Sequence, residues 1–384
     1  MNGGSVKGAS DAKGAMKVWL APAMPSENSL SMDLYHEDVR THLAEVAPEL
    51  CVKTIEPAWG RRQAWLFEQL ARYVTYPFAC RMKSRAAGPG TVFHVLDHSS
   101  GHLCRACSPS VVTCHDLADW RTSAMSGTQL RLWKYRVRGL RKARRIVAIS
   151  RNTAADIAEI LGISAAKIDI NPYGISPDFR PLRTPGEPRQ TPELAREDRS
   201  TLLLFHVGTN IPRKNIPTLL RALRAVNDSG QCAKLVKVGP DPRAEFAAMT
   251  AELALNDHII HLGSRTQQQL IAIYNDCDIL CFPSACEGFG RPVLEAQACG
   301  LPSVLANSSS LPEVGGDGAL FHETFDDAGL TRRILELAHS PGLTATMREK
   351  GFANARRFTW QRHAARLVDV YGEVLLSEKR MPQS

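Results

Sequence analysis

The stretch CEGFGRPVLEAQACG, residues 286–300, decides how the second half of this sequence folds. The residues before it, DILCFPS at 278–284, are apolar and end near a proline, which predicts a short buried strand. Pro292 suits the first turn of a helix, and Gly300 suits its end. The stretch therefore predicts a strand, a glycine-rich turn and a helix, with backbone N–H groups at the helix N-terminus available to an anion.

Two glutamates flank this turn, Glu287 before the helix and Glu295 within it. Phosphate oxygens accept hydrogen bonds from backbone N–H groups, whereas sugar hydroxyls donate to carboxylates. Together these groups are typical of a site for a sugar nucleotide. An ordinary strand–turn–helix connection with two surface glutamates has the same spacing, because glycine patterns taken alone are weak indicators.

Composition narrows the class of protein. A chain of 384 residues predicts two or three domains, and 44% hydrophobic residues are enough for sizeable cores. Residues 1–15 predict a disordered tail without the apolar region of a secretory signal, and no apolar run predicts a membrane span. The ten cysteines are scattered, which favours a reducing cytoplasm. The net charge of +8 favours anionic partners.

Short apolar runs alternate with helical periodicity in both halves of the chain, which predicts an α/β protein with two doubly wound, Rossmann-like domains. A helix is predicted at 63–76, ending at Pro77. A proline-rich, charged stretch at 181–199 predicts a linker between domains at 16–180 and 200–359. The closing helix at about 360–376 is expected to pack back on the first domain. The predicted strands are 16–21, 51–55, 91–96, 110–114, 145–150, 167–171, 201–207, 233–238, 258–262, 278–282, 302–306 and 319–321.

The first strand–helix turn of the second half is VGTNIPRKN, residues 207–215. Arg213 and Lys214 precede a predicted helix, and a guanidinium fork with an ammonium group is typical of a diphosphate site. A solvated basic turn is the alternative. Because ligands of such sheets bind beyond the carboxyl ends of the strands, this turn and the Glu287 turn are expected at one edge.

Taken together, these motifs resemble retaining glycosyltransferase family four, the glycosyl transferases group 1. The resemblance implies the GT-B architecture, in which two Rossmann-like domains face an interdomain cleft, with the acceptor side N-terminal and the nucleotide-sugar side C-terminal. It covers roughly residues 90–371. Its carriers are VGTNIPRKN at 207–215, EGFGRPVLE at 287–295, FPS at 282–284, VVTCHDL at 111–117, RIVAIS at 145–150, NPYGI at 171–175 and FTWQRHAARLVDVY at 358–371.

The resemblance implies roles for individual residues. Arg213 and Lys214 bind the donor diphosphate, Glu287 holds the transferred sugar and Glu295 binds the ribose. The implied catalytic residues are Glu287, His115, Lys214 and Arg213, the donor-binding residues also include Gly208, Gly288, Phe289, Gly290 and Glu295, and His98 and Asp116 lie on the acceptor side. The sequence departs from the family pattern at two places. PSENSLS at 25–31 replaces a glycine-rich loop, and its hydroxyls and amides can still contact phosphate or acceptor. Thr209 replaces an arginine, which puts one phosphate contact in doubt.

The implied reaction moves a hexose, with mannose as first candidate, from GDP-mannose or a UDP-sugar to a polysaccharide, lipopolysaccharide or lipid-linked acceptor. Cations and a helix N-terminus stabilise a departing diphosphate, so no metal or other cofactor is expected. A glycosidase-type mechanism needs two carboxylates at the bond that breaks. Because Glu295 is assigned to the ribose, we favour same-face substitution with retention of the anomeric configuration. Whether Glu287 is a nucleophile or a positioning group stays open. A catalytically silent binding module and a sugar-nucleotide epimerase are the alternatives.

Other motifs favour structural roles. Cys104 and Cys107 form a single C-x-x-C pair without a second pair at zinc-finger spacing. Asp276-Cys277-Asp278 imitates a metal-binding D-x-D motif, but it falls between a predicted helix and the start of a strand. That position lies at the sheet edge opposite to the ligand edge, so a metal site is not expected there.

The segment 130–145 predicts a basic helix with an apolar stripe at Leu130, Trp133, Val137 and Leu140. Such a helix either docks on the protein with a solvated basic face or is attracted to anionic lipid at the inner face of the membrane. Nucleic acid is not favoured, because stacking aromatics are missing. The basic residues are Arg131, Lys134, Arg136, Arg138, Arg141, Lys142, Arg144 and Arg145.

Overall fold

The computed structural model describes residues 16–24, 30–57, 65–122, 127–184, 187–240 and 244–380. The chain divides into two compact units, Met1–Gly174 with Trp360–Ser384, and Ile175–Thr359. The predicted tail 1–15 and most of the loop 25–31 lie outside the described residues. The second unit begins at Ile175 because its N–H donates to the carbonyl of Phe358 at 3.1 Å and it bridges to Thr359.

The first unit is built on a six-stranded parallel sheet in the order β2-β1-β3-β4-β5-β6. Every residue of β3 and β4 is buried, as expected for strands covered on both faces. The strands are β1 (Lys17–Ala21), β2 (Cys51–Thr54), β3 (Thr91–Val95), β4 (Ser110–Cys114), β5 (Arg145–Ala148) and β6 (Ile168–Ile170). Its helical elements include α1 (Leu30–Val46), η4 (His98–Arg105), α4 (Ala118–Thr122), α6 (Arg151–Leu161), η6 (Ala165–Lys167) and α15 (Trp360–Arg380).

The second unit repeats this architecture with a six-stranded parallel sheet in the order β12-β11-β10-β7-β8-β9. The strands are β7 (Leu202–Val207), β8 (Ala233–Val238), β9 (Ile259–Gly263), β10 (Ile279–Phe282), β11 (Ser303–Ala306) and β12 (Ala319–His322). The helices are α7 (Pro192–Ala195), η7 (Pro212–Lys214), α8 (Ile216–Asp228), α9 (Ala244–Glu252), η8 (Asn256–His258), α10 (Gln267–Asp276), α11 (Arg291–Cys299), α12 (Leu311–Gly315), η9 (Gly316–Gly318), α13 (Asp327–His339) and α14 (Pro341–Ala355).

The strand order of the second unit creates a topological switch point. The chain runs outward from β7 through β8 to β9, and β10 then returns to pair with β7 on its other side. The turns that follow β7 and β10 therefore leave the same sheet edge in opposite directions. In doubly wound sheets, this is where ligands bind.

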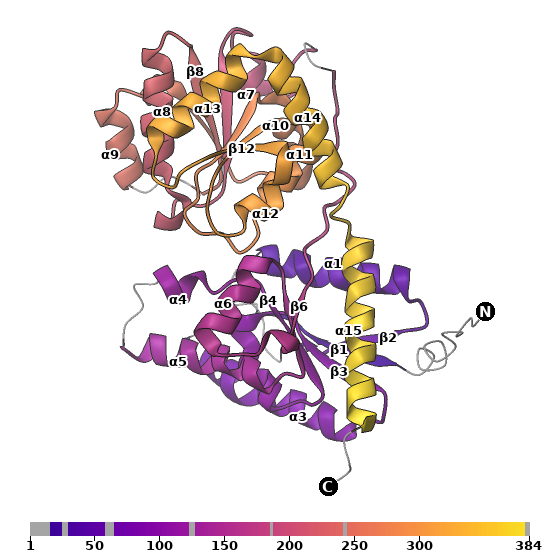
Figure 1. The fold of residues 1–384 in the computed structure, drawn as a ribbon. Helices are drawn as coiled ribbons and strands as arrows, with labels where there is room; N and C mark the ends of the chain where they lie inside the picture. The colour runs from indigo at the N-terminus through magenta and orange to yellow at the C-terminus, as the bar shows by residue number, and fades with distance from the viewer. Residues whose placement is uncertain are drawn as a thin grey trace, which may run out of the picture. The chain divides into compact units, whose positions relative to one another are not determined.

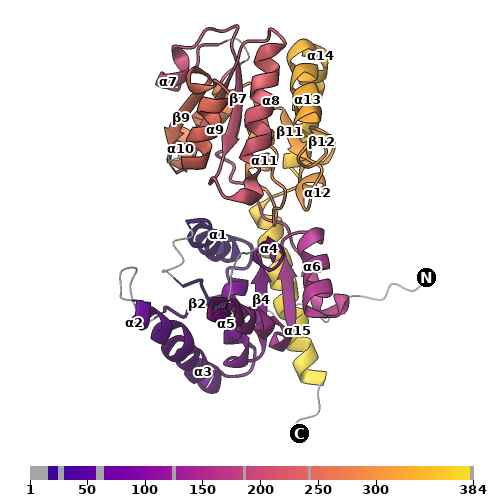
Figure 2. The same ribbon diagram turned by 90° about the vertical axis from the view of Figure 1, so that its left-hand side faces the viewer.

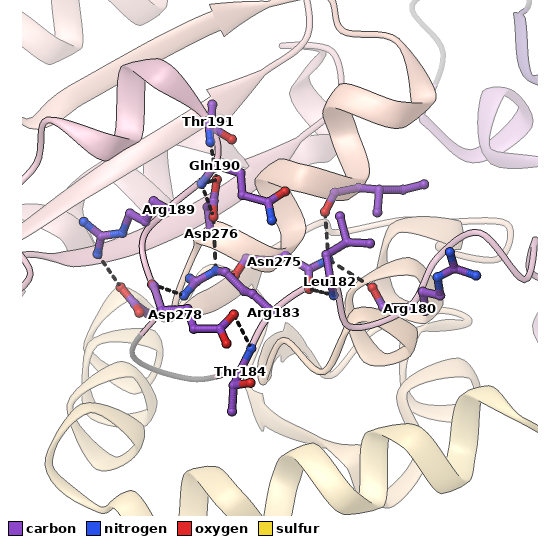
Figure 3. Close-up of polar contacts among 12 residues, drawn as sticks. Arg180, Leu182, Arg183, Thr184, Arg189, Gln190, Thr191, Asn275, Asp276 and Asp278 are labelled. Atoms are coloured by element: carbon purple, nitrogen blue, oxygen red, sulfur yellow. Dashed lines mark hydrogen bonds and ion pairs between the residues drawn. The ribbon is translucent and has the colours of Figure 1, made fainter.

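The predicted linker at 181–199 is wrong, because this segment packs on the second unit (Figure 3). The buried carboxylate of Asp276 accepts backbone N–H groups of Gln190 at 3.0 Å and Thr191 at 2.6 Å. Arg183 lies 3.1 Å from the same carboxylate, and Leu194 of α7 is fully buried. The proline-rich composition thus describes a strap tied down by Asp276 and also by Asn275, whose side chain accepts the Leu182 N–H at 2.7 Å.

The predicted end of a helix at Pro77 is also wrong. The chain continues through α2 (Trp65–Leu70), the π-helical segment η3 (Ala71–Thr75) and α3 (Tyr76–Ala86). Pro77 lies in the first turn of α3 and has no N–H, so it donates no hydrogen bond to the preceding helical turn. The π-turn lets the Tyr76 N–H reach the Ala71 carbonyl, so the chain stays helical across the proline.

The basic segment 130–145 is not one helix. It comprises the end of α5 (Gly127–Val137), the 3₁₀ segment η5 (Arg138–Lys142) and the start of β5. Gly139 lies so close to Gly101 that an added Cβ would stand 2.2 Å from the Gly101 carbonyl oxygen. This contact draws the chain back to the sheet. Trp133, Val137 and Leu140 are buried, so the predicted apolar stripe is confirmed as a docking face.

Helix α15 lies along the first unit, beside α1 and β3 (Figure 1). A buried hydrogen-bond chain fixes it there. Because a carbonyl only accepts, His363 donates through Nδ1 to Pro172 at 2.9 Å and accepts through Nε2 from Tyr35 at 3.2 Å. The chain continues from Thr113 to Tyr35 at 3.1 Å, from His94 Nε2 to Thr113 at 2.8 Å, and from Tyr371 to His94 Nδ1 at 2.7 Å.

No helix in the described part of the chain combines the length and the apolar composition needed to cross a bilayer.

Candidate functional site

The switch point of the second unit brings together the two turns that the sequence singled out. After β7, the chain passes Gly208, which has a φ of 141°, and enters η7 with Arg213 and Lys214. Asn215 then adopts a left-handed conformation and starts α8. After β10, the chain forms the turn 283–290 and starts α11. The Ala285 N–H donates to the Arg213 carbonyl at 2.8 Å, which ties the two turns together.

Arg213 and Lys214 converge on Glu287. Lys214 Nζ lies 2.5 Å from Oε1, and Arg213 Nη1 lies 3.2 Å from Oε2. Arg213 Nη1 also donates to the Cys286 carbonyl at 3.0 Å. The three side chains are only 8, 12 and 24% exposed for Glu287, Lys214 and Arg213, so water screens these charges poorly. The group carries one net positive charge and has both carboxylate oxygens occupied.

The turn before α11 is held from the protein interior. The Glu287 N–H donates to Ser309 Oγ at 2.9 Å, and Ser310 Oγ lies 3.0 Å from the carbonyls of both Glu287 and Phe289. The Phe289 ring packs into the core against Phe358, with centroids 5.9 Å apart. The backbone of the turn is therefore preorganised before any ligand arrives.

Gly290 is required by its backbone conformation at the start of α11. Its φ of 94° is in the region that favours glycine, and an added Cβ would lie 2.9 Å from Leu311 Cδ2. Gly288 is buried beside it in the same turn. The predicted helix from Pro292 to Cys299 and its stop at Gly300 are confirmed, since α11 spans Arg291–Cys299 with Gly300 in a left-handed conformation.

Glu295 lies on α11 and is buried. Tyr274 of α10 donates its hydroxyl to Glu295 Oε2 at 2.7 Å, and Arg291 Nε lies 4.0 Å from Oε1. Burial raises the pKa of Glu295, while Arg291 and the Tyr274 hydrogen bond act in the opposite direction. The sequence did not single out Tyr274, whose ring is fixed edge-on against Phe205 at 4.9 Å.

Lys237 is a second group that the sequence reasoning missed. It belongs to β8 and is fully buried, yet its ammonium donates to the Gly208 carbonyl at 2.5 Å and to the Val238 carbonyl at 3.1 Å. Burial, and then the charge of Lys214, lower the pKa of Lys237 to about 8. The run 233–238 contains two lysines, Lys234 and Lys237, and the sequence alone does not show that Lys237 is the buried one. It holds the Gly208 peptide from beneath the turn.

His206 lies beside these cations at the end of β7. Its Nδ1 donates to the Cys281 carbonyl at 3.1 Å, and its ring stacks on Phe282 with centroids 5.7 Å apart. Nε2 has no hydrogen-bond partner among the described residues. Burial, followed by the charge of Lys237, lowers the pKa of His206 to about 3, so the imidazole is neutral at physiological pH.

The remaining predicted site residues belong to the first unit. His115 is buried and has both ring nitrogens occupied, Nε2 by the Leu96 carbonyl at 2.7 Å and Nδ1 by the Tyr173 hydroxyl. Burial lowers the pKa of His115 to about 4. His98 is partly exposed and lies 3.1 Å from Asp97, while Asp116 accepts the Ala118 N–H at 3.1 Å. His115 thus orders the ends of β3 and β4.

The motif Asp276-Cys277-Asp278 lies at the opposite edge of the second sheet, between α10 and β10. Asp276 is engaged by the strap described above (Figure 3). Asp278 accepts the Leu203 N–H at 2.8 Å. In the described ranges, no three or more His, Cys, Asp or Glu side chains lie close enough together to hold a metal ion.

Two Rossmann-like units, each built on a sheet of parallel strands, are typical of the GT-B class of glycosyltransferases. In this chain the second unit carries a basic turn and a glutamate turn at its switch point. The model of "Glycosyl transferases group 1" matches residues 190–354, and that of "Glycosyltransferase Family 4" matches residues 41–179. The chain belongs to the group 1 glycosyl transferases and is a glycosyltransferase.

Two curated relatives and one solved structure illustrate the similarity. The D-inositol 3-phosphate glycosyltransferase of Actinosynnema mirum is 30% identical over 287 residues, covering 69% of this chain and 67% of the relative. The O-antigen chain mannosyltransferase B of Escherichia coli is 25% identical over 325 residues, covering 81 and 77%. The fold is also similar to that of Anabaena Alr3699/HepE in complex with UDP and glucose, with a TM-score of 0.71, 17% identity, and 92 and 99% coverage.

Proposed function

We propose that this glycosyltransferase moves a hexose from a nucleoside diphosphate sugar to a glycan or lipid-linked acceptor, with retention of the anomeric configuration. GDP-mannose is the first donor to test, since a mannosyltransferase is among the relatives, and UDP-sugars follow. The observation that carries the proposal is the convergence of Arg213, Lys214 and Glu287 at the switch point.

The leaving group is the diphosphate, which gains negative charge as the anomeric bond breaks. Arg213, Lys214 and the N-terminus of α11 supply positive charge at the same sheet edge, and Lys237 adds a buried ammonium below it. Preorganised charges of this kind stabilise a developing anion without rearrangement. Glu295, held by Tyr274, is our candidate for the ribose hydroxyls.

Glu287 suits a positioning role better than that of a nucleophile. A nucleophilic carboxylate needs a free oxygen directed at the anomeric carbon, whereas both oxygens of Glu287 are engaged by cations. Charge donation to two cations also weakens a carboxylate as a nucleophile. We therefore propose same-face substitution, in which Arg213 and Lys214 bind the diphosphate with the loss of one contact to Glu287. Glu287, held by the remaining contact, orients the sugar.

For the acceptor we propose a bacterial-type surface glycan or its lipid-linked precursor, in line with the O-antigen relative. The basic side chains of residues 130–145 support attraction to an anionic membrane surface. His98 and Asp116 are the acceptor-side candidates, because their side chains are only partly buried at the carboxyl edge of the first sheet.

A donor panel tests the proposal. The purified protein is incubated with GDP-mannose, UDP-glucose, UDP-galactose and UDP-N-acetylglucosamine, with and without a chelator, and with a lipid-linked acceptor extract. We expect one donor to be consumed, the product to gain one hexose by mass, and its anomeric coupling to match that of the donor. Chelation is expected to leave the rate unchanged.

Three results would count against the proposal. Inverted product stereochemistry would exclude same-face substitution. Conversion of one sugar nucleotide into its epimer without any acceptor would establish the epimerase alternative. Absence of both turnover and thermal stabilisation with every nucleotide would favour a silent binding module.

A further inference from the structure

One helical face of the first unit is apolar on the outside. The segment 65–86, formed by α2, η3 and α3, exposes five large apolar side chains, each 42 to 61% exposed. We call these five the outer stripe: Phe67, Leu70, Val74, Phe78 and Met82. The inner face of the same segment is docked in the core through Ala71, Tyr76 and Cys80. A helix docked by one apolar face normally presents polar residues on the other, so a second apolar face is unusual.

The outer stripe is continuous because of the π-helical segment. The side chains of the stripe are mostly four residues apart. In an α-helix, with 3.6 residues per turn, a step of four residues rotates slightly more than one full turn. In the wider π-helix the same step rotates slightly less than one full turn. The step from Leu70 to Val74 crosses η3 and so offsets the drift of the α-helical step from Val74 to Phe78. From Phe67 to Met82 the stripe spans roughly 22 Å along the helix.

Positive charge surrounds the outer stripe. Arg81 and Arg85 are exposed on the same segment, and its one acidic residue, Glu68, is paired with Arg72 at 3.2 Å. Helix α5 lies beside it, with the rings of Tyr73 and Tyr135 6.4 Å apart, and the two views agree on this placement (Figures 1 and 2).

The neighbouring segment adds two further cations. Arg131 on α5 and Arg138 on η5 are exposed. Among the described residues, no ion pair is recorded for either of them or for Arg81 and Arg85. The surface is therefore apolar along a line and cationic on its borders.

We propose that the outer stripe inserts into the boundary between headgroups and acyl chains of an anionic bilayer, while the bordering arginines contact lipid phosphates. Amphipathic helices with aromatic and aliphatic residues on one side and basic residues beside them lie in this plane of a membrane. The anionic headgroups match the charge of the bordering arginines. A second copy of the chain would instead face these like charges with its own, which disfavours a symmetric dimer here.

This inference deepens the membrane attraction proposed above and rests on that part of the proposed function, but it uses no residue of the donor turn. It also separates two roles within the basic surface. Residues 130–145 contribute cations, but their apolar stripe is buried and unavailable for insertion. The inserting side chains come from 65–86, of which the sequence predicts only the part up to residue 76 as a helix.

Vesicle flotation tests the proposal on the full-length protein. We expect binding to mixed phosphatidylcholine–phosphatidylglycerol vesicles and much weaker binding to phosphatidylcholine alone. The double substitution Val74→Asp with Phe78→Asp is expected to weaken binding to mixed vesicles by roughly tenfold or more, since two charges replace inserted groups. The matched control is Phe325→Asp, at a 64% exposed phenylalanine of the second unit. Its φ of 64° is one that aspartate tolerates, and we expect no change in binding.

The charge border is tested separately. Arg81→Glu with Arg85→Glu keeps the outer stripe but reverses its border, and we expect the preference for phosphatidylglycerol to disappear. Lys379→Glu with Arg380→Glu, at two exposed positions near the end of α15, serves as the control with the same change of charge and is expected to retain the preference.

Insertion is read out directly with Phe78→Trp, a conservative change at an exposed site. We expect its added emission to shift to shorter wavelength on mixed vesicles and to be quenched by lipids brominated on the acyl chains. This variant also decides the matter if the double aspartate variant fails to fold, because absence of quenching would overturn the proposal.

Two further results would overturn it. Vesicle binding that survives both aspartates would show that the stripe does not insert. Wild-type protein that is dimeric in buffer, and becomes monomeric with the double substitution, would assign the stripe to a second copy. The donor panel is run with a detergent-solubilised acceptor, on which we expect the double variant to act at the wild-type rate, so failure of vesicle binding and failure of glycosyl transfer are distinguishable.

Discussion

Replacement of Glu287 by glutamine is expected to tighten the binding of a nucleoside diphosphate while slowing glycosyl transfer. In the structure, Lys214 Nζ lies 2.5 Å from Oε1 and Arg213 Nη1 lies 3.2 Å from Oε2. A diphosphate that binds these cations competes with the Glu287 carboxylate for them. Glu287→Gln keeps the shape of the side chain and removes the competing charge.

The expected gain in diphosphate affinity follows from the displacement of one hydrogen bond between a cation and Glu287. A hydrogen bond to a charged group contributes about 1.5–3 kcal/mol to stability. Relief of one such bond therefore tightens binding by roughly tenfold or more, since about 1.4 kcal/mol corresponds to a factor of ten. Transfer is expected to fall by roughly 100-fold, as for the loss of one preorganised electrostatic contact.

Calorimetric titration with GDP and UDP, followed by initial rates with the active donor, measures both effects. Glu349→Gln, at an exposed position of α14, is the matched control and is expected to change neither. Higher salt should narrow the difference in affinity between wild type and Glu287→Gln, because screening weakens the competition. Weaker diphosphate binding by the variant, or transfer at the wild-type rate, would refute this reasoning.

Further predictions concern the support of the site and acid stability. Lys237→Met should raise the KM for the donor by roughly threefold or more through loss of the turn's buried anchor, and an unchanged KM would contradict this role. Gly290→Ala should lower the unfolding free energy by about 1–2 kcal/mol, because φ is 94° and Leu311 blocks the new methyl group; denaturant titration measures it. Burial lowers the pKa of His94 to about 3 and of His363 to about 4, against 6.5 in an exposed chain. As the pH falls, these histidines are protonated in the unfolded chain before they are protonated in the folded protein. The free energy of unfolding should therefore decrease as the pH drops from about 6.5 towards 4, which thermal melts measure.

Local sequence patterns carry much of the fold. The apolar runs at 110–114 and 233–238 coincide with β4 and β8. Ser150, a residue type that favours helix starts, caps α6, with its side chain accepting the Thr153 N–H at 3.0 Å. Such features depend on residues a few positions apart, so their energetics are readable from the chain itself. The proximity of the two βα turns also follows from strand order, because parallel strands end at a common edge.

Contacts between distant residues were not readable in this way. The strap at 181–199 resembles a linker in composition, yet Asp276 binds it from 85 positions away. The helix through Pro77 continues because a π-turn accommodates the proline, and no residue pattern marks that turn. Tyr274 and Lys237 join the site only because α10 and β8 pack beside α11 and β7.

The sequence by itself determined two Rossmann-like sheets and a cationic turn opposite a glutamate turn, because strand alternation, glycine positions and helix caps are local. Only the tertiary structure decided that both oxygens of Glu287 are occupied by Lys214 and Arg213. It also decided that the five side chains of the outer stripe face outward. Hydrophobicity alone does not tell which face of a helix meets the core; the packing of the whole unit selects it.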